Sequence, residues 1–242
     1  IDLKVAGPTN NVKIDFDAEM SDFGFLGFNI GNVAGKLEYN INKKTLSVFK
    51  IDSILNNSEI FASGELVFGD NSNIDFHIIT PRITYQDSLF MYQPLTKDIS
   101  WLKQKDDFEY LADYKVTGPM DPKKLTVKGY FKGGESVFLG EEVNSFEGKY
   151  SYQNQKVQIS NFTINNGKGK IFFNASYDIP TSDFNYSTEV ESIRLSDFEF
   201  INSLNLGLDG EVVGVSKKKK KRGILKTNSN FNLLSTKIGI EE

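Results

Sequence analysis

The amino-acid sequence predicts an all-β protein, namely an elongated, strongly curved antiparallel sheet of repeating strands (a β-taco or groove) with one short helical insertion. Apolar and polar residues alternate along most of the chain, and turn-forming residues separate the alternating segments. Short motifs also recur in the same order about 110 residues apart. Because successive side chains of a strand point to opposite faces, each segment has one apolar face and one polar face.

Composition limits the function classes. The chain has 242 residues, of which 39% are apolar, so it can build a core and is not a disordered segment. Its net charge of −4 argues against nucleic acid as a partner, since such binders carry a basic domain. The absence of cysteine excludes a disulfide framework, a thiolate metal site and a cysteine nucleophile. We therefore expect no cofactor and no metal.

The repeated motifs set the expected organisation. The sequence KVAGP at 4–8 returns as KVTGP at 115–119. FLG returns at 138–140 after its first occurrence at 25–27, and GKLEY at 35–39 is followed by GKYSY at 148–152. A further Val-Gly pair at 213–214 reopens the pattern. Recurrence at a fixed period is typical of stacked arrays.

We therefore predict one continuous architecture of three parts. A first β-groove repeat covers 1–114 and includes a helical insertion at 87–112. A second repeat covers 115–210, and 211–242 begins a third.

Strands are expected wherever the alternation is clear. In the first repeat these segments lie around 12–17, 37–41, 60–68 and 74–78. In the second they lie around 125–131, 146–152, 157–159, 171–177 and 184–190, and 204–212 opens the third. Turn-forming residues at 69–73, 153–155, 165–167 and 180–183 separate them, and the spacing of about 8–12 residues suits an antiparallel meander.

The insertion departs from this alternation. Trp101, Phe108 and Leu111 fall at helical spacing, and Asp98 or Ser100 could cap the first turn. These residues predict a short helix, which could cover an edge of the sheet.

The order of motifs resembles the AsmA-like superfamily, and TamB-type proteins in particular. The resemblance lies in the V-x-G-P motifs, the two GK motifs, the segment SGEL at 63–66 and GEVVG at 210–214. It implies an elongated groove in the bacterial cell envelope, as an internal fragment of a periplasmic segment anchored in the inner membrane through parts outside this chain. Its lumen would conduct phospholipid between the inner and outer membranes and support outer-membrane biogenesis.

The predicted function is therefore non-enzymatic binding and conduction of phospholipid acyl chains, with envelope proteins at either end as candidate partners. An alternative is a structural β-sandwich or solenoid segment of a surface or adhesion protein without a ligand. The groove lining is predicted from the inward alternating set: Ile14, Phe16, Leu37, Tyr39, Ile60, Leu66, Phe68, Ile74, Phe76, Leu125, Val127, Phe131, Phe146, Tyr150, Tyr152, Ile171, Phe173, Tyr177, Phe184, Tyr186, Leu204, Leu206 and Leu208.

Other chemistry-bearing residues suggest no catalytic site. His77 is expected to point outward from a strand, and no catalytic partner is suggested by spacing. The acidic pairs at 106–107 and 141–142 are adjacent strand residues, which point apart. Six consecutive cations from Lys217 to Arg222 are expected at a hairpin loop, where they either remain solvated or contact anionic lipid headgroups.

Overall fold

The computed structural model describes residues 3–8, 11–25, 28–92, 109–138, 141–167, 169–194, 208–221 and 224–238. The chain divides into two compact units. Unit 1 comprises Ile1–Lys103, Glu109–Gly129 and Tyr152–Asn154, and unit 2 comprises Gln104–Phe108, Tyr130–Ser151 and Gln155–Glu242. This division falls inside a strand, so the predicted repeat boundaries at 114 and 210 stay a prediction.

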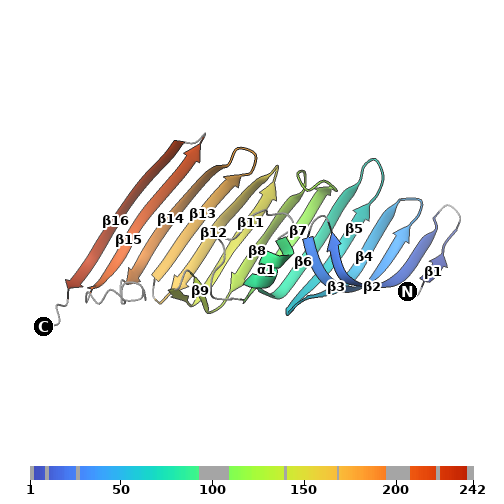
Figure 1. Cartoon of the computed structure of the whole chain (residues 1–242), viewed down its shortest axis with the longest axis horizontal. Helices are drawn as coiled ribbons and strands as arrows, with labels where there is room; N and C mark the ends of the chain where they lie inside the picture. Colours follow the sequence, from blue (N-terminus) through green and yellow to red (C-terminus); the bar gives the residue numbers. More distant parts are fainter. Residues whose placement is uncertain are drawn as a thin grey trace. The chain divides into compact units, whose positions relative to one another are not determined.

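Fourteen strands follow one another in chain order in a single sheet (Figure 1). β9 and β10 form a separate two-stranded sheet, so β8 neighbours β11. Every pair with a defined register is antiparallel. The strands are β1 (Leu3–Ala6), β2 (Lys13–Phe25), β3 (Phe28–Asn40), β4 (Thr45–Leu55), β5 (Ser58–Val67), β6 (Asn73–Thr84), β7 (Glu109–Pro119), β8 (Thr126–Gly133), β9 (Ser136–Phe138), β10 (Glu141–Val143), β11 (Ser145–Gln153), β12 (Lys156–Asn166), β13 (Gly169–Asp178), β14 (Asp183–Arg194), β15 (Leu208–Lys221) and β16 (Ile224–Ile238). Together with α1 (Tyr85–Tyr92), the one helix among the described residues, this confirms the predicted fold class.

Most strands are longer than the predicted spacing of 8–12 residues allows. Strands β2 and β3 have 13 residues each, and β6 has 12. The prediction failed because several strands contain a bulge, where the alternation of apolar and polar residues changes phase and a single strand looks like two.

The bulges recur at equivalent places in the two units. The register shifts between Val48 and Ile51 in β4, and between Ile159 and Phe162 in β12. At the second bulge Asn161 has a positive φ of 51°, and its N–H donates to the Asn174 side chain of β13. A bulge bends its strand and increases the local twist. Each unit therefore contains a strand that is bent by a bulge at an equivalent place.

The repeated motifs also occupy matching elements. Gly7 and Gly118 of the two V-x-G-P motifs both have positive φ, at 110° and 121°. The first residue of each FLG motif ends a strand of a hairpin, where Phe25 pairs with Phe28 and Phe138 with Glu141. The β9–β10 hairpin therefore corresponds to the outer ends of β2 and β3.

Helix α1 differs from the predicted helix. It begins directly after β6, where the Asp87 N–H donates to Thr84 Oγ1 (3.0 Å), so Thr84 is the capping residue. Leu111 was wrongly assigned to a helix, because it lies in β7, whose alternating residues pair with β6. Trp101, Phe108, Asp98 and Ser100 lie outside the described residues.

The lysine run also differs from its prediction. Lys217 to Lys221 lie within β15 and pair with β16, and Lys217 to Lys220 also pair with β14. The predicted loop position is therefore wrong for these five residues. Lysine tolerates a strand because its long stem can lie along the sheet while its ammonium group reaches water.

Candidate functional site

The apolar face of unit 1 is a continuous surface across its strands. Residues that pair across neighbouring strands lie on the same face, and the registers run Ile14–Tyr39, Tyr39–Leu46, Leu46–Leu66 and Leu66–Ile74. The face comprises Ile14, Phe16, Leu37, Tyr39, Leu46, Val48, Ile60, Leu66, Ile74 and Phe76. Eight of these ten residues were predicted; Leu46 and Val48 were missed.

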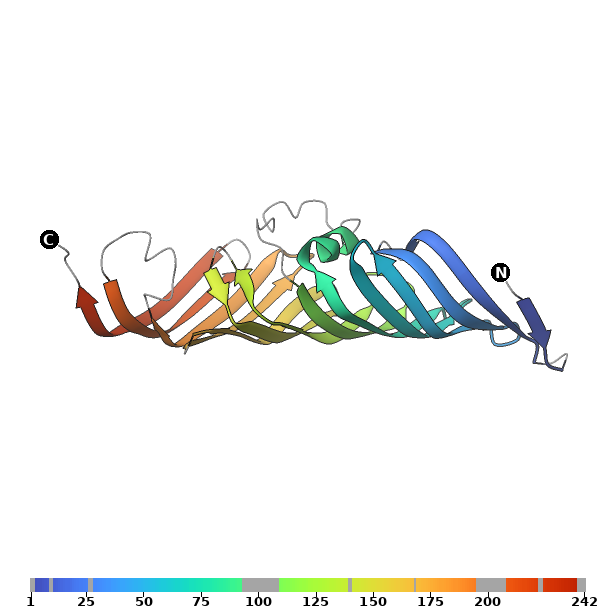
Figure 2. The same cartoon turned by 90° about the horizontal axis from the view of Figure 1, so that it is seen from below.

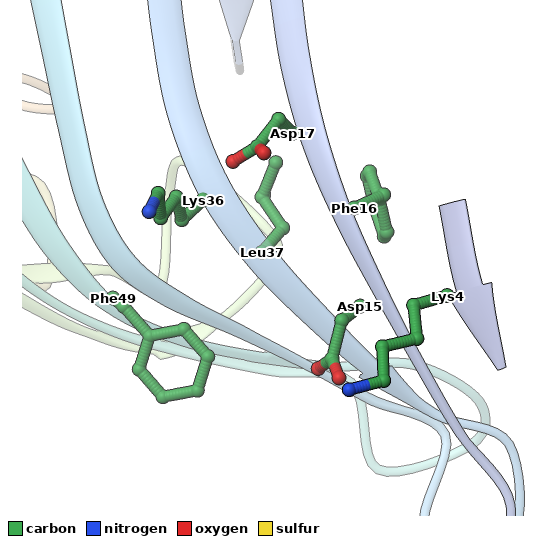
Figure 3. A pocket seen from close by; sticks show the side chains of 7 residues that line it. All are labelled: Lys4, Asp15, Phe16, Asp17, Lys36, Leu37 and Phe49. Carbon is green, nitrogen blue, oxygen red and sulfur yellow. The ribbon is translucent and has the colours of Figure 1, made fainter. Parts of the chain in front are cut away.

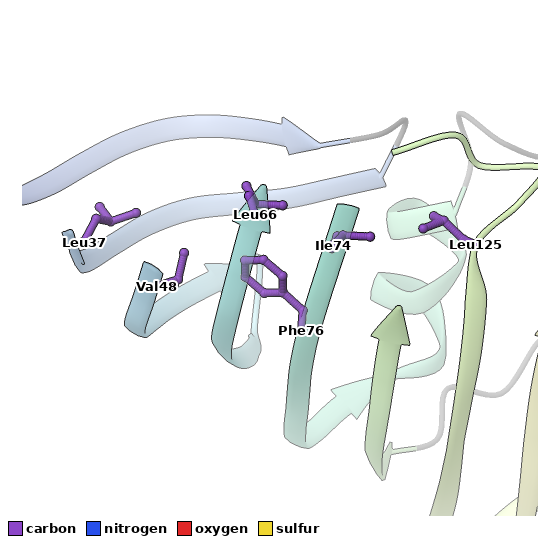
Figure 4. Close-up of a cluster of buried hydrophobic side chains, with 6 residues drawn as sticks. All are labelled: Leu37, Val48, Leu66, Ile74, Phe76 and Leu125. Carbon is purple, nitrogen blue, oxygen red and sulfur yellow. The ribbon is translucent and has the colours of Figure 1, made fainter. Parts of the chain in front are cut away.

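The centre of this face is buried. Figure 4 shows Leu37, Val48, Leu66, Ile74 and Phe76 of neighbouring strands together with Leu125, which directly precedes β8, and each is at most 8% exposed. Small residues between them make this packing possible. A Cβ on Gly64 would lie 2.1 Å from the Asp75 carbonyl oxygen, and one on Gly35 would meet Ile51. Side chains that pack this closely leave little apolar surface for a ligand.

Helix α1 covers a further part of this face. Met91 packs in a second buried cluster with Leu55, Ile60 and Ile83. Figure 2 shows α1 lying against the sheet beside the strands that carry this cluster. Burial raises the pKa of Tyr110, which packs against the cluster, so its phenol stays neutral.

A buried carboxylate fixes the helix. Asp87 is 5% exposed, and its two oxygens accept hydrogen bonds from Asn56 Nδ2 and Ser58 Oγ, both at 2.6 Å. Ser58 is itself fully buried. Because both donors lie at the β4–β5 turn, this network ties α1 to the sheet.

Unit 2 carries aromatic side chains instead. Phe131 lies between strand neighbours, with its ring centroid 6.2 Å from that of Phe146 and 5.4 Å from that of Phe162. Phe162 contacts Phe173 at 6.2 Å, and Phe173 contacts Tyr186 at 5.9 Å. With Tyr150, which lies 6.3 Å from Phe131, these six residues form the aromatic row.

The aromatic row is more open than the apolar face of unit 1. Phe146 is buried at 2% exposure, whereas the other five rings are only partly buried. Gly148 lies beneath the row, where a Cβ would come within 2.9 Å of Phe131. The row therefore offers ring surface that is not covered within the described residues.

The predicted lining is largely brought together within each unit. Phe68 stacks edge-on against Tyr39 at 6.3 Å, Tyr152 packs against the Leu37 cluster, and Val127 lies two residues beyond Leu125 in the same strand phase. In unit 2, Ile171, Tyr177 and Phe184 share the face of Phe173 by register. Leu204 and Leu206 lie outside the described residues, and Leu208 is described only as the first residue of β15.

Phe162 was missed because the bulge in β12 reverses the alternation that places Val157 and Ile159 on one face. The positive φ of Asn161 is the physical cause, and an asparagine in a strand is the signal that could have indicated it.

The polar face of unit 1 is held by ion pairs. Lys13 binds Glu38 at 2.8 Å, Lys115 binds Asp75 at 3.0 Å, and Arg82 binds Glu109. The hydrogen bond from Arg82 and its positive charge hold the pKa of Glu109 below its usual value. These pairs are exposed and contribute little stability individually.

His77 lies on this polar face, as predicted, and half of its side chain is exposed. Its Nε2 lies 2.7 Å from Asp113 Oδ1, a partner that sequence spacing did not indicate. The pair extends the row of ion pairs next to Lys115, which occupies the position opposite His77 in the register. It stands on the face opposite the apolar one.

A shallow hollow of about 450 Å³ also lies in unit 1. Figure 3 shows Lys4, Asp15, Asp17 and Lys36 around it, with Phe49 at one side. The charged residues belong to the polar face, and their opposite signs offset one another. Phe16 and Leu37, which belong to the apolar face, also line the hollow, so charged and apolar residues meet there.

The acidic pairs give no catalytic arrangement. Glu141 and Glu142 are consecutive in β10, and residues 106–107 lie outside the described residues. Among the described side chains, no group of three or more His, Asp or Glu residues could hold a metal ion. Within the same residues, no helix has the length and apolar character to cross a membrane.

The fold and the two surfaces define a repeat-built antiparallel β-sheet protein with one apolar and one polar face. Comparison with protein-family models, curated proteins and solved structures gives no match.

Proposed function

We propose that this chain is a non-enzymatic lipid-binding segment whose aromatic row holds acyl chains. The observation that carries the proposal is the continuity of partly buried rings over β8, β11, β12, β13 and β14. Acyl chains need a dry, uniform surface and no specific polar partner, and a row of packed aromatic rings provides one.

The wider role follows from the resemblance in motif order and from this surface. Phospholipid would move along the apolar side of the sheet with its headgroup in water, in a bacterial envelope protein that links the inner and outer membranes. The resemblance to TamB-type proteins supports this role, together with the alternation that places charged residues on the opposite face.

A structural role without a ligand is the second candidate, and unit 1 favours it. The centre of its apolar face is closed by its own side chains, and Met91 of α1 closes a further part. If the row of unit 2 is equally covered by the rest of the protein, no lipid can reach it.

A photoreactive phenylalanine analogue distinguishes the two. Phe173 lies in the aromatic row, whereas its neighbour Phe172 pairs with Thr163 and Glu189 on the opposite face. With the analogue at 173, irradiation of the purified protein with phosphatidylcholine vesicles should give a lipid adduct detectable by mass spectrometry. The analogue at 172 is the matched control and should give none. Equal labelling at both positions, or no adduct at 173, would overturn lipid binding by the row.

A further inference from the structure

The aromatic row ends at a lysine. Tyr186 is its last ring, and in the sheet register Tyr186 stands opposite Lys218 of β15. The next position on the same face pairs Phe184 with Lys220. Because residues two apart in a strand share a face, Lys218 and Lys220 occupy the face of the aromatic row, and Lys217 and Lys219 occupy the other.

In unit 1 neither of these two positions holds a charged residue. Strand β7 pairs with β6 as β15 pairs with β14, and there Phe76 stands opposite Val116 and Ile74 opposite Gly118. In unit 2 the corresponding partners of Tyr186 and Phe184 are lysines. A charge therefore stands where the other repeat continues its apolar surface.

The register partners of Lys217 and Lys218, whose side chains the structure describes, do not neutralise them. Lys217 to Lys220 face Ser187, Tyr186, Asn185 and Phe184 on β14. On β16 the five lysines face Asn228, Thr227, Lys226, Leu225 and Ile224. None of these register partners is acidic. By contrast, Lys13 and Lys115 of unit 1 each bind a carboxylate.

We propose that Lys218 binds the anionic headgroup of a lipid whose acyl chain lies on the aromatic row. This inference rests on the proposed function and adds a substrate class, because an apolar row alone would not distinguish headgroups. The partly buried position of Lys218 beside Tyr186 suits an amphiphile that is apolar at one end and negative at the other.

The test compares two lipids with identical acyl chains, phosphatidylglycerol and phosphatidylcholine, in binding to the full chain. The wild-type protein should bind phosphatidylglycerol about tenfold more tightly, a difference of about 1.4 kcal/mol. Lys218→Gln should remove the preference and leave phosphatidylcholine binding unchanged. The matched control, Lys217→Gln, makes the same charge change on the opposite face and should keep the preference.

Each remaining outcome decides between the two proposals. If the wild type binds both lipids equally, the headgroup site is wrong and the lipid-binding function stands. If it binds neither lipid, both proposals fail. Competition by inorganic phosphate without any acyl-chain dependence would indicate a free-phosphate site and overturn the amphiphile. Binding of a single-stranded oligonucleotide that Lys217→Gln and Lys218→Gln weaken equally, with no lipid preference, would assign the run to nucleic acid instead.

Discussion

The two units use the same strands and bulges but place different side chains on the equivalent face. Ala18, Ile51 and Ala62 of unit 1 occupy the places that Phe131, Phe162 and Phe173 occupy in unit 2, as the repeated hairpins and bulges show. In unit 1 the aliphatic neighbours close over the small residues and are buried. In unit 2 rings fill these places and remain partly exposed.

The difference shows that burial in such a sheet is set by the size pattern of one face. A single sheet has no second layer to cover it, so its side chains can be buried only against neighbours on the same face or against an added element such as α1. Small residues beside medium ones give a closed surface, whereas a row of rings gives an open one. The same backbone therefore provides a self-sealed section and a section suited to a ligand.

The largest expected effect is a difference in the free energy of unfolding between substitutions in the apolar face of unit 1 and in the aromatic row of unit 2. Phe76→Ala should lower the free energy of unfolding by about 3–5 kcal/mol, because Phe76 is 8% exposed and its removal leaves a cavity. Phe173→Ala should cost roughly half as much, since its partly exposed ring loses less transfer free energy. Urea unfolding of both variants measures the difference. A loss at Phe173 equal to that at Phe76 would show that the aromatic row is also a closed core.

A smaller effect is expected when the hydrogen bonds that hold α1 against the apolar face of unit 1 are removed. Asp87→Ala removes the acceptor of Asn56 and of the fully buried Ser58, which should cost about 1–3 kcal/mol. Loosening of α1 should expose the cluster around Met91, so the variant should bind an apolar fluorescent dye more strongly than the wild type. Ser72→Ala at the exposed β5–β6 turn is the control and should leave dye binding unchanged. Unchanged dye binding in Asp87→Ala would mean that α1 does not seal the face.

Most of this fold could be predicted because period-two alternation survives over most strands. The eight predicted residues of the unit 1 face, which run from Ile14 in β2 to Phe76 in β6, were assigned to one face correctly. The alternating segments that contain them are regular. Alternation could not locate Phe162, whose phase depends on a bulge formed by the backbone of Asn161.

The predictions of a helix at Leu111 and of a loop at the lysine run were wrong for a different reason. Local propensity favours a helix around Leu111 and a loop at Lys217, but pairing with neighbouring strands outweighs both preferences. Such pairing partners are far apart in sequence, so a local pattern does not contain them. Lys218 is relevant to the proposed site because it lies opposite Tyr186, and this pairing is visible only in the register of the sheet.

The smallest expected effect compares two exposed carboxyls, one in each unit. The pKa of Glu109 is lowered by the hydrogen bond and charge of Arg82, whereas the pKa of Asp178 is lowered mainly by hydrogen bonds from the Thr181 side chain and backbone. Each group stabilises the folded state at pH values above its ordinary pKa, and this contribution is lost as pH falls through the lowered value.

Arg82→Gln should return the Glu109 pKa to the ordinary range, and Thr181→Val should raise that of Asp178. Carboxyl NMR titrations measure both values, and 1 M salt should move Glu109 more than Asp178 because salt screens a charge more than a hydrogen bond within a turn. Equal salt shifts would mean that the Arg82 charge contributes little, and that the ion pairs of the unit 1 polar face hold their carboxylates by hydrogen bonding alone.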